Sequence, residues 1–272
     1  MRRAPATAKL NLALVVGPAR DDGRHEVVTI LQRLDLADRV AVEPAAKLSV
    51  EGFAEDTLVR RALESVAAAA QVEPRWRATI SKRIPVAAGL GGGSSDAATA
   101  LRLANETLDE PLPAERLHEL AAGLGADVPF FLTAGPQLAR GTGTELEQLD
   151  LPQDYWVVLL LPRGEHKPST ASVYAGFDRR GGAEGFDERR ARLREALDAA
   201  QRPGDLAALP PNDLATSPHA HRLLELGAFR ADVSGAGPAV YGLFLHRAQA
   251  AAAERELRAF GRTWITVPTW YG

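Results

Sequence analysis

Apolar and polar residues alternate in two stretches of the first half of the chain, and this alternation predicts strands. In 76–80 every second residue is apolar, as expected for a strand with one buried face. The same period runs through 10–16, where one face would carry Leu10, Leu12, Leu14 and Val16. Lys9 and Asn11 are therefore expected together on the opposite face of that strand.

Spacings of three and four residues between apolar positions predict helices elsewhere. They run through 97–108 and again through 117–124, where Gly123 and Gly125 indicate the end of the helix. A further helix is expected from about Leu58 to Ala70.

The order of these elements changes near residue 150. Residues 1–150 would form a strand, its hairpin partner over 25–44, a helix, a strand, a glycine-rich loop, two helices and a strand-turn segment over 137–149. Residues 151–272 begin with the apolar strand DYWVVLLLP and continue in β-α-β-β-α-β order with one extra helix, which is a ferredoxin-like order. We predict an α+β protein with domains at 1–150 and 151–272.

The segment Pro85–Ala98, PVAAGLGGGSSDAA, concentrates glycine and serine between the strand predicted over 76–80 and a helix. Each ordered glycine costs about 0.5–1 kcal/mol relative to alanine, so the cluster needs a compensating reason. Ser94 or Ser95 is suited to cap the helix, and Asp96 would lie near the positive end of its dipole. Because the free N–H groups of a helix start bind phosphate, we predict a phosphate-binding loop rather than a flexible linker or an empty turn.

Two common phosphate-binding patterns do not fit this loop. No lysine follows the glycines, as a P-loop requires, and Ser94 stands where the dinucleotide-binding fingerprint needs its third glycine.

Composition narrows the class of protein. The chain has 272 residues, a net charge of −3 and no cysteine. Nothing in this composition requires a nucleic acid or a membrane surface as partner, and thiolate metal sites and disulfides are excluded. Lys9 and Asn11 interrupt the apolar run that follows the basic start, so we expect a cytoplasmic protein without a secretory signal.

Two ionisable residues are in positions suited to chemistry. Lysine is rare, at positions 9, 47, 82 and 167 only, and Lys9 shares a strand face with Asn11. Asp127 precedes Pro129 and two phenylalanines, so its carboxylate would lose part of its hydration, which suits a proton acceptor. On pattern alone, Lys9 also fits a solvated strand face and Asp127 a capping turn. His219 and His221 have no third ligand nearby, so we expect a solvated helix start rather than a metal site.

The glycine-rich segment resembles the ATP-binding motif of the GHMP kinases. Within that family, further motifs resemble the branch that phosphorylates a cytidine diphosphate-linked methylerythritol, and they occur in the expected order: Thr7–Leu14, Asp22–Thr29, Leu124–Phe131, Ser169–Tyr174, Asn212–Leu214 and Ser234–Pro238. The family also has an N-terminal α+β ATP-binding domain and a C-terminal ferredoxin-like domain, with the active site in the cleft between them.

The resemblance implies roles for individual residues. Asp127 would be the base and Lys9 its electrostatic partner, Asn11 and His25 would touch the substrate, and Thr170 and Tyr174 would border the cytidine. ATP with Mg²⁺ would bind the loop residues Pro85, Val86, Ala87, Ala88, Gly89, Leu90, Gly91, Gly92, Gly93, Ser94 and Ser95. The implied partner is thus a small molecule, with no nucleic acid or membrane, and the metal ligands and oligomeric state stay open.

Three positions depart from the pattern of this branch. Arg24 replaces the tyrosine that stacks on the cytosine, although a planar guanidinium can also lie over a base. Thr57 replaces an asparagine near the adenine, and Thr144 stands where an acid is common. We therefore still expect Arg24 to bind the substrate. None of the three departures changes Lys9 or Asp127, the residues expected to carry the chemistry.

Two alternatives remain at the level of the sequence. Another GHMP kinase, for homoserine or a mevalonate derivative, is disfavoured by GRHE and STASVY, which resemble cytidine-side motifs. An inactive nucleotide-binding regulator on the same fold is disfavoured because the chain carries both Lys9 and Asp127.

Overall fold

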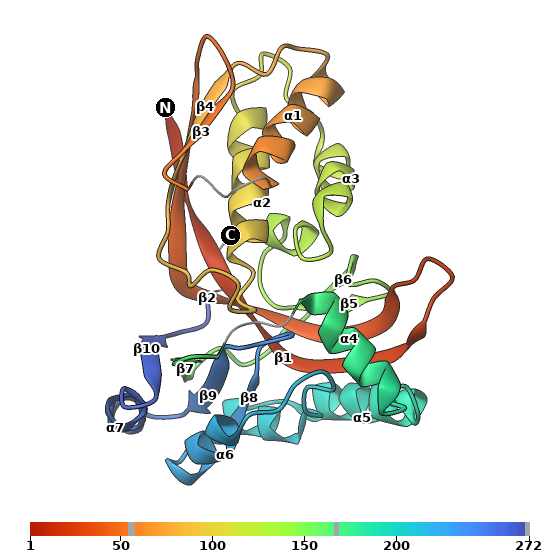
Figure 1. The fold of residues 1–272 in the computed structure, drawn as a ribbon, viewed down its shortest axis with the longest axis vertical. Helices are drawn as coiled ribbons and strands as arrows, with labels where there is room; N and C mark the ends of the chain where they lie inside the picture. Colours follow the sequence, from red (N-terminus) through yellow and green to blue (C-terminus); the bar gives the residue numbers. More distant parts are fainter. Residues whose placement is uncertain (54–57, 166–168, 270–272) are drawn as a thin grey trace.

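A long antiparallel hairpin organises the protein, which we describe from a computed structural model (Figure 1). The structure describes residues 1–53, 58–165 and 169–269, so the departure at Thr57 lies outside it. Strands β1 (Arg2–Ala19) and β2 (His25–Pro44) form the hairpin. The prediction of β2 over 25–44 is confirmed, whereas β1 is longer than the sequence pattern predicted. Both strands run from the upper part of the molecule down to its middle, where β1 lies above the strands of the lower part (Figure 1).

The upper part is a sheet with helices on one face. Its strands follow the order β3-β4-β2-β5-β6, with β1 pairing β2 as well. The remaining elements are β3 (Ser49–Glu51), α1 (Leu58–Ala70), β4 (Trp76–Ser81), α2 (Gly92–Asn105), α3 (Ala114–Leu124), the 3-10 helix η1 (Pro129–Leu132), β5 (Gln137–Arg140) and β6 (Glu145–Gln148). The alternation in 76–80 is confirmed, because β4 buries every second residue.

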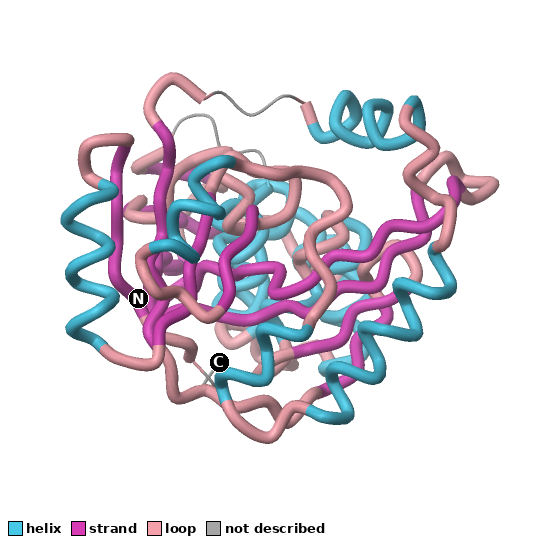
Figure 2. Tube along the Cα trace, turned by 90° about the horizontal axis from the view of Figure 1, so that it is seen from below, coloured by secondary structure: helices cyan, strands magenta, loops and turns pink. Residues whose placement is uncertain are grey.

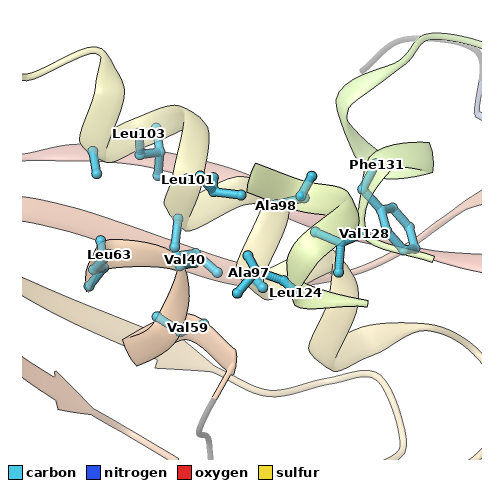
Figure 3. Close-up of a cluster of buried hydrophobic side chains, with 14 of the residues drawn as sticks. Val40, Val59, Leu63, Ala97, Ala98, Leu101, Leu103, Leu124, Val128 and Phe131 are labelled. Atoms are coloured by element: carbon cyan, nitrogen blue, oxygen red, sulfur yellow. The ribbon is translucent and has the colours of Figure 1, made fainter. Parts of the chain in front are cut away.

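Helix α2 forms the centre of the upper core. Its small residues Ala97 and Ala98 allow close contact with α1 and with the loop after α3, while Leu101 fills the space beside Val40 of β2 (Figure 3). The sequence predicted α1 with these bounds and α2 with a later start and end.

The lower part is an antiparallel sheet of order β10-β7-β9-β8. The elements are β7 (Trp156–Pro162), α4 (Thr170–Arg179), α5 (Phe186–Ala199), the 3-10 helix η2 (Pro203–Ala208), α6 (Pro218–Glu225), β8 (Arg230–Val233), β9 (Val240–Phe244), α7 (Arg247–Leu257) and β10 (Gly261–Thr266). The ferredoxin-like order is confirmed, with α4 as a helix that the apolar pattern did not indicate. Seen from below, strands run through the middle of the molecule and helices lie to either side (Figure 2).

One apolar cluster joins the two parts. Leu10 and Leu12 of β1 pack with Val157 and Leu159 of β7 and with Tyr241 of β9. The hairpin therefore belongs to two cores at once, and a domain boundary near residue 150 stays a prediction.

The predicted face of β1 is wrong beyond Leu12. The register with β2 shifts between Asn11 and Ala13, so Leu12 is an extra residue in the strand. Such a bulge reverses the alternation. Leu14 consequently leaves the cluster that holds Leu12 and faces the same cavity as Lys9 and Asn11.

Among the residues that the structure describes, no helix combines the length and apolar character needed to cross a bilayer.

Candidate active site

A cavity of about 480 Å³ opens between the two parts of the molecule. Its wall combines side chains of the hairpin, the loop 85–91, the first turn of α2, Ala126 and Asp127 after α3, α4, and the turn at Gly235. Segments more than a hundred residues apart in the sequence therefore meet around one space.

The glycine-rich loop leads directly into α2, and glycine is required at its end. Gly91 is the N-cap of α2 with a φ of 71°, in the left-handed region. A Cβ at Gly91 would lie 2.9 Å from Lys9 Cγ and 2.9 Å from Phe131 Cζ. The predicted caps Ser94 and Ser95 are wrong, because the helix begins two residues earlier, at Gly92. The reason is that the left-handed glycine turns the chain into the helix without a side-chain cap.

Three consecutive carbonyls of this loop are held by other segments. Ala88 O accepts from Ala239 N, Gly89 O from Ser234 Oγ and Leu90 O from Lys9 N, each at 3.0 Å. These three acceptors of the loop are thus already engaged by donors of the protein.

The first turn of α2 offers donors to the cavity. Gly92, Gly93 and Ser94 line the cavity and are partly exposed. The N–H groups of a first helical turn have no partner within the helix, and together with the dipole they favour an anion. Ser95, by contrast, is 1% exposed and is not part of the cavity wall, unlike the other ten predicted loop residues.

Lys82 is a cavity residue that the sequence analysis did not single out. Its Nζ donates to Asp38 Oδ2 at 2.5 Å and to Asp96 Oδ2 at 2.6 Å, and both carboxylates are buried. Burial lowers the pKa of Lys82, but the hydrogen bonds to Asp38 and Asp96 outweigh it, so the pKa is raised and the side chain stays cationic. The rarity of lysine in this chain was the signal that could have found it.

Asp96 therefore binds Lys82, whereas the sequence analysis expected it to interact with the dipole at the start of α2. It is the fifth residue of α2, fully buried, and bound to Lys82 instead of lying free at the helix start. Asp38 holds the beginning of the loop as well, because Ile84 N donates to its Oδ1 at 2.8 Å.

Lys9, Asn11 and Asp127 converge at the centre of the cavity. Lys9 Nζ donates to Asn11 Oδ1 at 2.6 Å and lies 3.5 Å from Asp127 Oδ2. The Lys9 side chain is 5% exposed, whereas that of Asp127 is 38% exposed. A buried cation thus faces a carboxylate that is open to the cavity.

Helix α4 brings two of the predicted substrate residues to the same cavity. Thr170 and Tyr174 both belong to its wall. Burial raises the pKa of Tyr174 to about 12, and the negative charge of Asp127 adds to that rise. The phenol is therefore uncharged near neutral pH, and it lies close enough to Asp127 to experience its charge.

Two predicted substrate residues do not line the cavity. His25 packs behind Tyr174, with ring centroids 4.8 Å apart, and its Nε2 lies 2.7 Å from Asp178 Oδ1. Arg24 is largely exposed and pairs with Asp22 at 3.2 Å. The structure thus brings Lys9, Asn11, Asp127, Thr170 and Tyr174 to one cavity with the loop, and leaves Arg24 and His25 outside its wall.

The histidines of α6 have surface contacts. His221 is 78% exposed and lies 3.5 Å from Glu225 one turn later, while the ring of His219 lies beside that of Phe260 at a tilt of 53°. Within the described ranges, no three histidine or acidic side chains gather in a way that could hold a metal ion.

Known proteins share this architecture and these motifs. The family model described as the GHMP kinases N terminal domain matches residues 57–135, and the GHMP kinases C terminal model matches 221–263. A 4-diphosphocytidyl-2-C-methyl-D-erythritol kinase from Chlorobium chlorochromatii is 36% identical across 97% of this chain and 96% of its own. The chain belongs to the GHMP kinase family. The resemblance that its motifs indicated is thereby confirmed.

Solved structures of GHMP kinases agree with this assignment. A crystal structure of a 4-(cytidine 5'-diphospho)-2C-methyl-D-erythritol kinase matches with a TM-score of 0.79 and 33% identity, over the full length of both chains. A mevalonate kinase from Methanococcus jannaschii matches with a TM-score of 0.76 at 13% identity, over 98% of each chain, which shows a shared fold alone. The protein is therefore an ATP-dependent small-molecule kinase of the predicted α+β, GHMP-type fold.

Proposed function

We propose that this kinase phosphorylates the 2-hydroxyl of 4-(cytidine 5'-diphospho)-2-C-methyl-D-erythritol, a step of the non-mevalonate route to isoprenoid precursors. The observation that carries the proposal is the contact between Lys9 and Asp127, 3.5 Å apart, beside the glycine-rich loop. Kinases that carry this substrate in their names, at 33% and 36% identity over almost the whole chain, support the choice of substrate.

Asp127 accepts the proton of the attacking hydroxyl in this proposal. The hydroxyl oxygen forms a bond to the γ-phosphorus as the bond from that phosphorus to the β-γ bridging oxygen breaks, giving a phosphate monoester and ADP. Lys9 stabilises the negative charge that spreads over the transferring group, which is the main requirement of phosphoryl transfer. Asn11 holds Lys9 in place through its 2.6 Å contact.

The residues of the loop fit ATP. The first turn of α2 directs free N–H groups to the cavity, and a side chain at Gly91 would collide with Lys9 and Phe131. Mg²⁺ neutralises phosphate charge when bound, and such ions keep most of their coordination from phosphates and water. Ser94 is the hydroxyl of this loop that lines the cavity and could join that coordination.

The cytidine would lie at the end of the cavity formed by α4. Tyr174 offers an aromatic face there, backed by His25, and Thr170 offers a hydroxyl. Arg24 is exposed at the turn of the hairpin, so it would supply the second flat face only after its side chain leaves Asp22.

The proposal is tested by measuring ADP release from the purified protein with ATP and Mg²⁺. We expect turnover with the cytidine-linked methylerythritol and none above background with homoserine or mevalonate. A preference for homoserine or mevalonate would overturn the substrate, and ATP binding without turnover of any of the three would favour the inactive regulator.

A further inference from the structure

The orientation of the Asn11 amide decides how Lys9 is held. An asparagine side chain carries an oxygen that accepts and a nitrogen that only donates, and the two can exchange places by rotation. With the oxygen towards Lys9, the ammonium gains the 2.6 Å hydrogen bond that the structure has. With the nitrogen there, two donors would face each other, and Lys9 would lose this hydrogen bond and be displaced from its present position.

Thr29 of β2 determines which of these orientations is present. Its hydroxyl has one proton, and that proton is donated to Ala13 O at 2.7 Å. Towards Asn11 the hydroxyl can therefore only accept, so the Asn11 atom 2.8 Å away must be the nitrogen. The oxygen of the amide is then left for Lys9.

We propose that Thr29 is a positioning residue of this kinase, because its buried hydroxyl orients Asn11 and thereby Lys9. The chain of contacts runs from Ala13 O through Thr29 and Asn11 to Lys9 and ends at Asp127. Thr29 is 4% exposed, and its hydroxyl already makes two hydrogen bonds, so its part is to align other groups. This inference rests on the proposed roles of Lys9 and Asp127.

The bulge in β1 makes this arrangement possible. Leu12 is the extra residue, and Asn11 and Ala13 lie on either side of it. Because of the bulge, a single hydroxyl on the neighbouring strand reaches both the carbonyl of Ala13 and the side chain of Asn11.

The substitution Thr29→Val tests the proposal, since it removes the hydroxyl and keeps the branched shape that a strand favours. We expect kcat to fall by about 10- to 100-fold, because small misplacements of catalytic groups have effects of this size. KM for ATP should stay within about twofold of the wild-type value. Thr29→Ser, which restores the hydroxyl, should recover most of the lost kcat.

Thr7→Val is the matched control. Thr7 lies on β1 and is 7% exposed, and its Oγ1 has no hydrogen-bond partner among the described residues. The same chemical change in the neighbouring strand should therefore leave kcat unchanged. Thr29→Ala is measured in parallel, because it also removes the hydroxyl but adds no methyl group. If the second methyl of valine prevents folding, the alanine variant still tests the proposal.

A second readout needs no turnover. The chain has four lysines, so ¹³Cε-labelled lysine gives a simple spectrum in which Lys9 is assigned from Lys9→Arg. We expect the Lys9 signal to move in Thr29→Val and Thr29→Ala but to keep its position in Thr29→Ser and Thr7→Val. The Lys82 signal should be constant throughout.

Three results would overturn the proposal: unchanged kcat in folded Thr29→Val, no rescue by serine, or an equal loss in Thr7→Val. If the wild-type protein does not act on the cytidine-linked substrate, the proposed function fails instead. The lysine spectrum then decides the positioning role alone, and an unmoved Lys9 signal in the variants without the hydroxyl would refute it.

Discussion

At the scale of single residues, the pairing of a buried lysine with an open carboxylate organises the site. The sequence could indicate Lys9 and Asp127 as candidates because one is a rare lysine on a strand face and the other borders an apolar turn. It could not indicate Thr29 or Lys82, since their partners come from other elements: Asn11 from β1, Asp38 from β2 and Asp96 from α2. Contacts of this kind exist only once the elements are packed.

Asp127→Asn tests the proposed base at this scale. The amide has nearly the same shape but cannot take up the proton, so kcat should fall by roughly 10²- to 10⁴-fold. The dissociation constant for ATP, measured by calorimetry, should change little. Asp187→Asn, a change at a side chain 79% exposed on α5, should leave kcat at the wild-type value. Near-normal turnover in Asp127→Asn would remove this carboxylate from the mechanism.

At the scale of elements, two local features positioned the site and escaped the sequence pattern. Alternation predicted β1 correctly as a strand, but no periodicity reveals an extra residue, so the faces of Leu14 and Val16 came out wrong. Serine is a frequent helix cap, yet Gly91 took that position because the left-handed turn needs glycine. In both cases tertiary contacts override a local preference.

Tyr241→Phe tests the support of the bulge from the other sheet. The Tyr241 hydroxyl lies 3.1 Å from Asn11 O and 3.2 Å from Leu12 O, and burial raises its pKa to about 12, so it remains a donor. Its removal takes this donor away from the two buried carbonyls, which should lower the free energy of unfolding by about 1–3 kcal/mol. Urea denaturation measures this change.

Tyr155→Phe is the control for that substitution. Tyr155 is as deeply buried, but its hydroxyl has no hydrogen-bond partner within the described part of the chain. Its removal should leave stability unchanged or raise it. Equal losses in the two variants would show that the hydroxyl of Tyr241 does not support the bulge.

Gly91→Val tests the turn into α2. The new side chain would need a φ that valine rarely adopts and would meet Lys9 and Phe131 at 2.9 Å. We therefore expect loss of ATP binding and of turnover in a protein that still melts cooperatively. Gly123→Ala, where a Cβ meets no atom within 4 Å, should keep full activity. ATP affinity at the wild-type level in Gly91→Val would contradict this account of the loop.

At the scale of the whole molecule, the hairpin of β1 and β2 joins the two parts that the sequence analysis assigned to separate domains. Element order predicted the ferredoxin-like sheet correctly, because the strands of 151–272 and the helices α5, α6 and α7 each have their own pattern, although α4 does not. The apolar cluster shared by β1, β7 and β9 could not be predicted, since alternation shows that a face is buried but not against what. The cavity depends on this junction, because its walls come from both parts.

We expect the shared cluster to make unfolding a single transition. Separating the two parts would expose Leu10 and Leu12 together with Val157 and Leu159, which are all 1% exposed or less. Apolar burial contributes about 25 cal/mol per Å², so neither part should remain folded once the other is lost. Scanning calorimetry should give equal calorimetric and van't Hoff enthalpies. Two resolved transitions would instead favour independent domains.

The three anchored carbonyls of the loop have a consequence for the kinetics of nucleotide capture. Fixing the backbone of one residue removes roughly 1–2 kcal/mol of conformational entropy at room temperature. For Ala88, Gly89 and Leu90 this loss occurs when the chain folds, through their bonds to Ala239, Ser234 and Lys9. We therefore expect ATP to meet a loop that is already ordered at these three residues, and to bind without a slow ordering step of this segment.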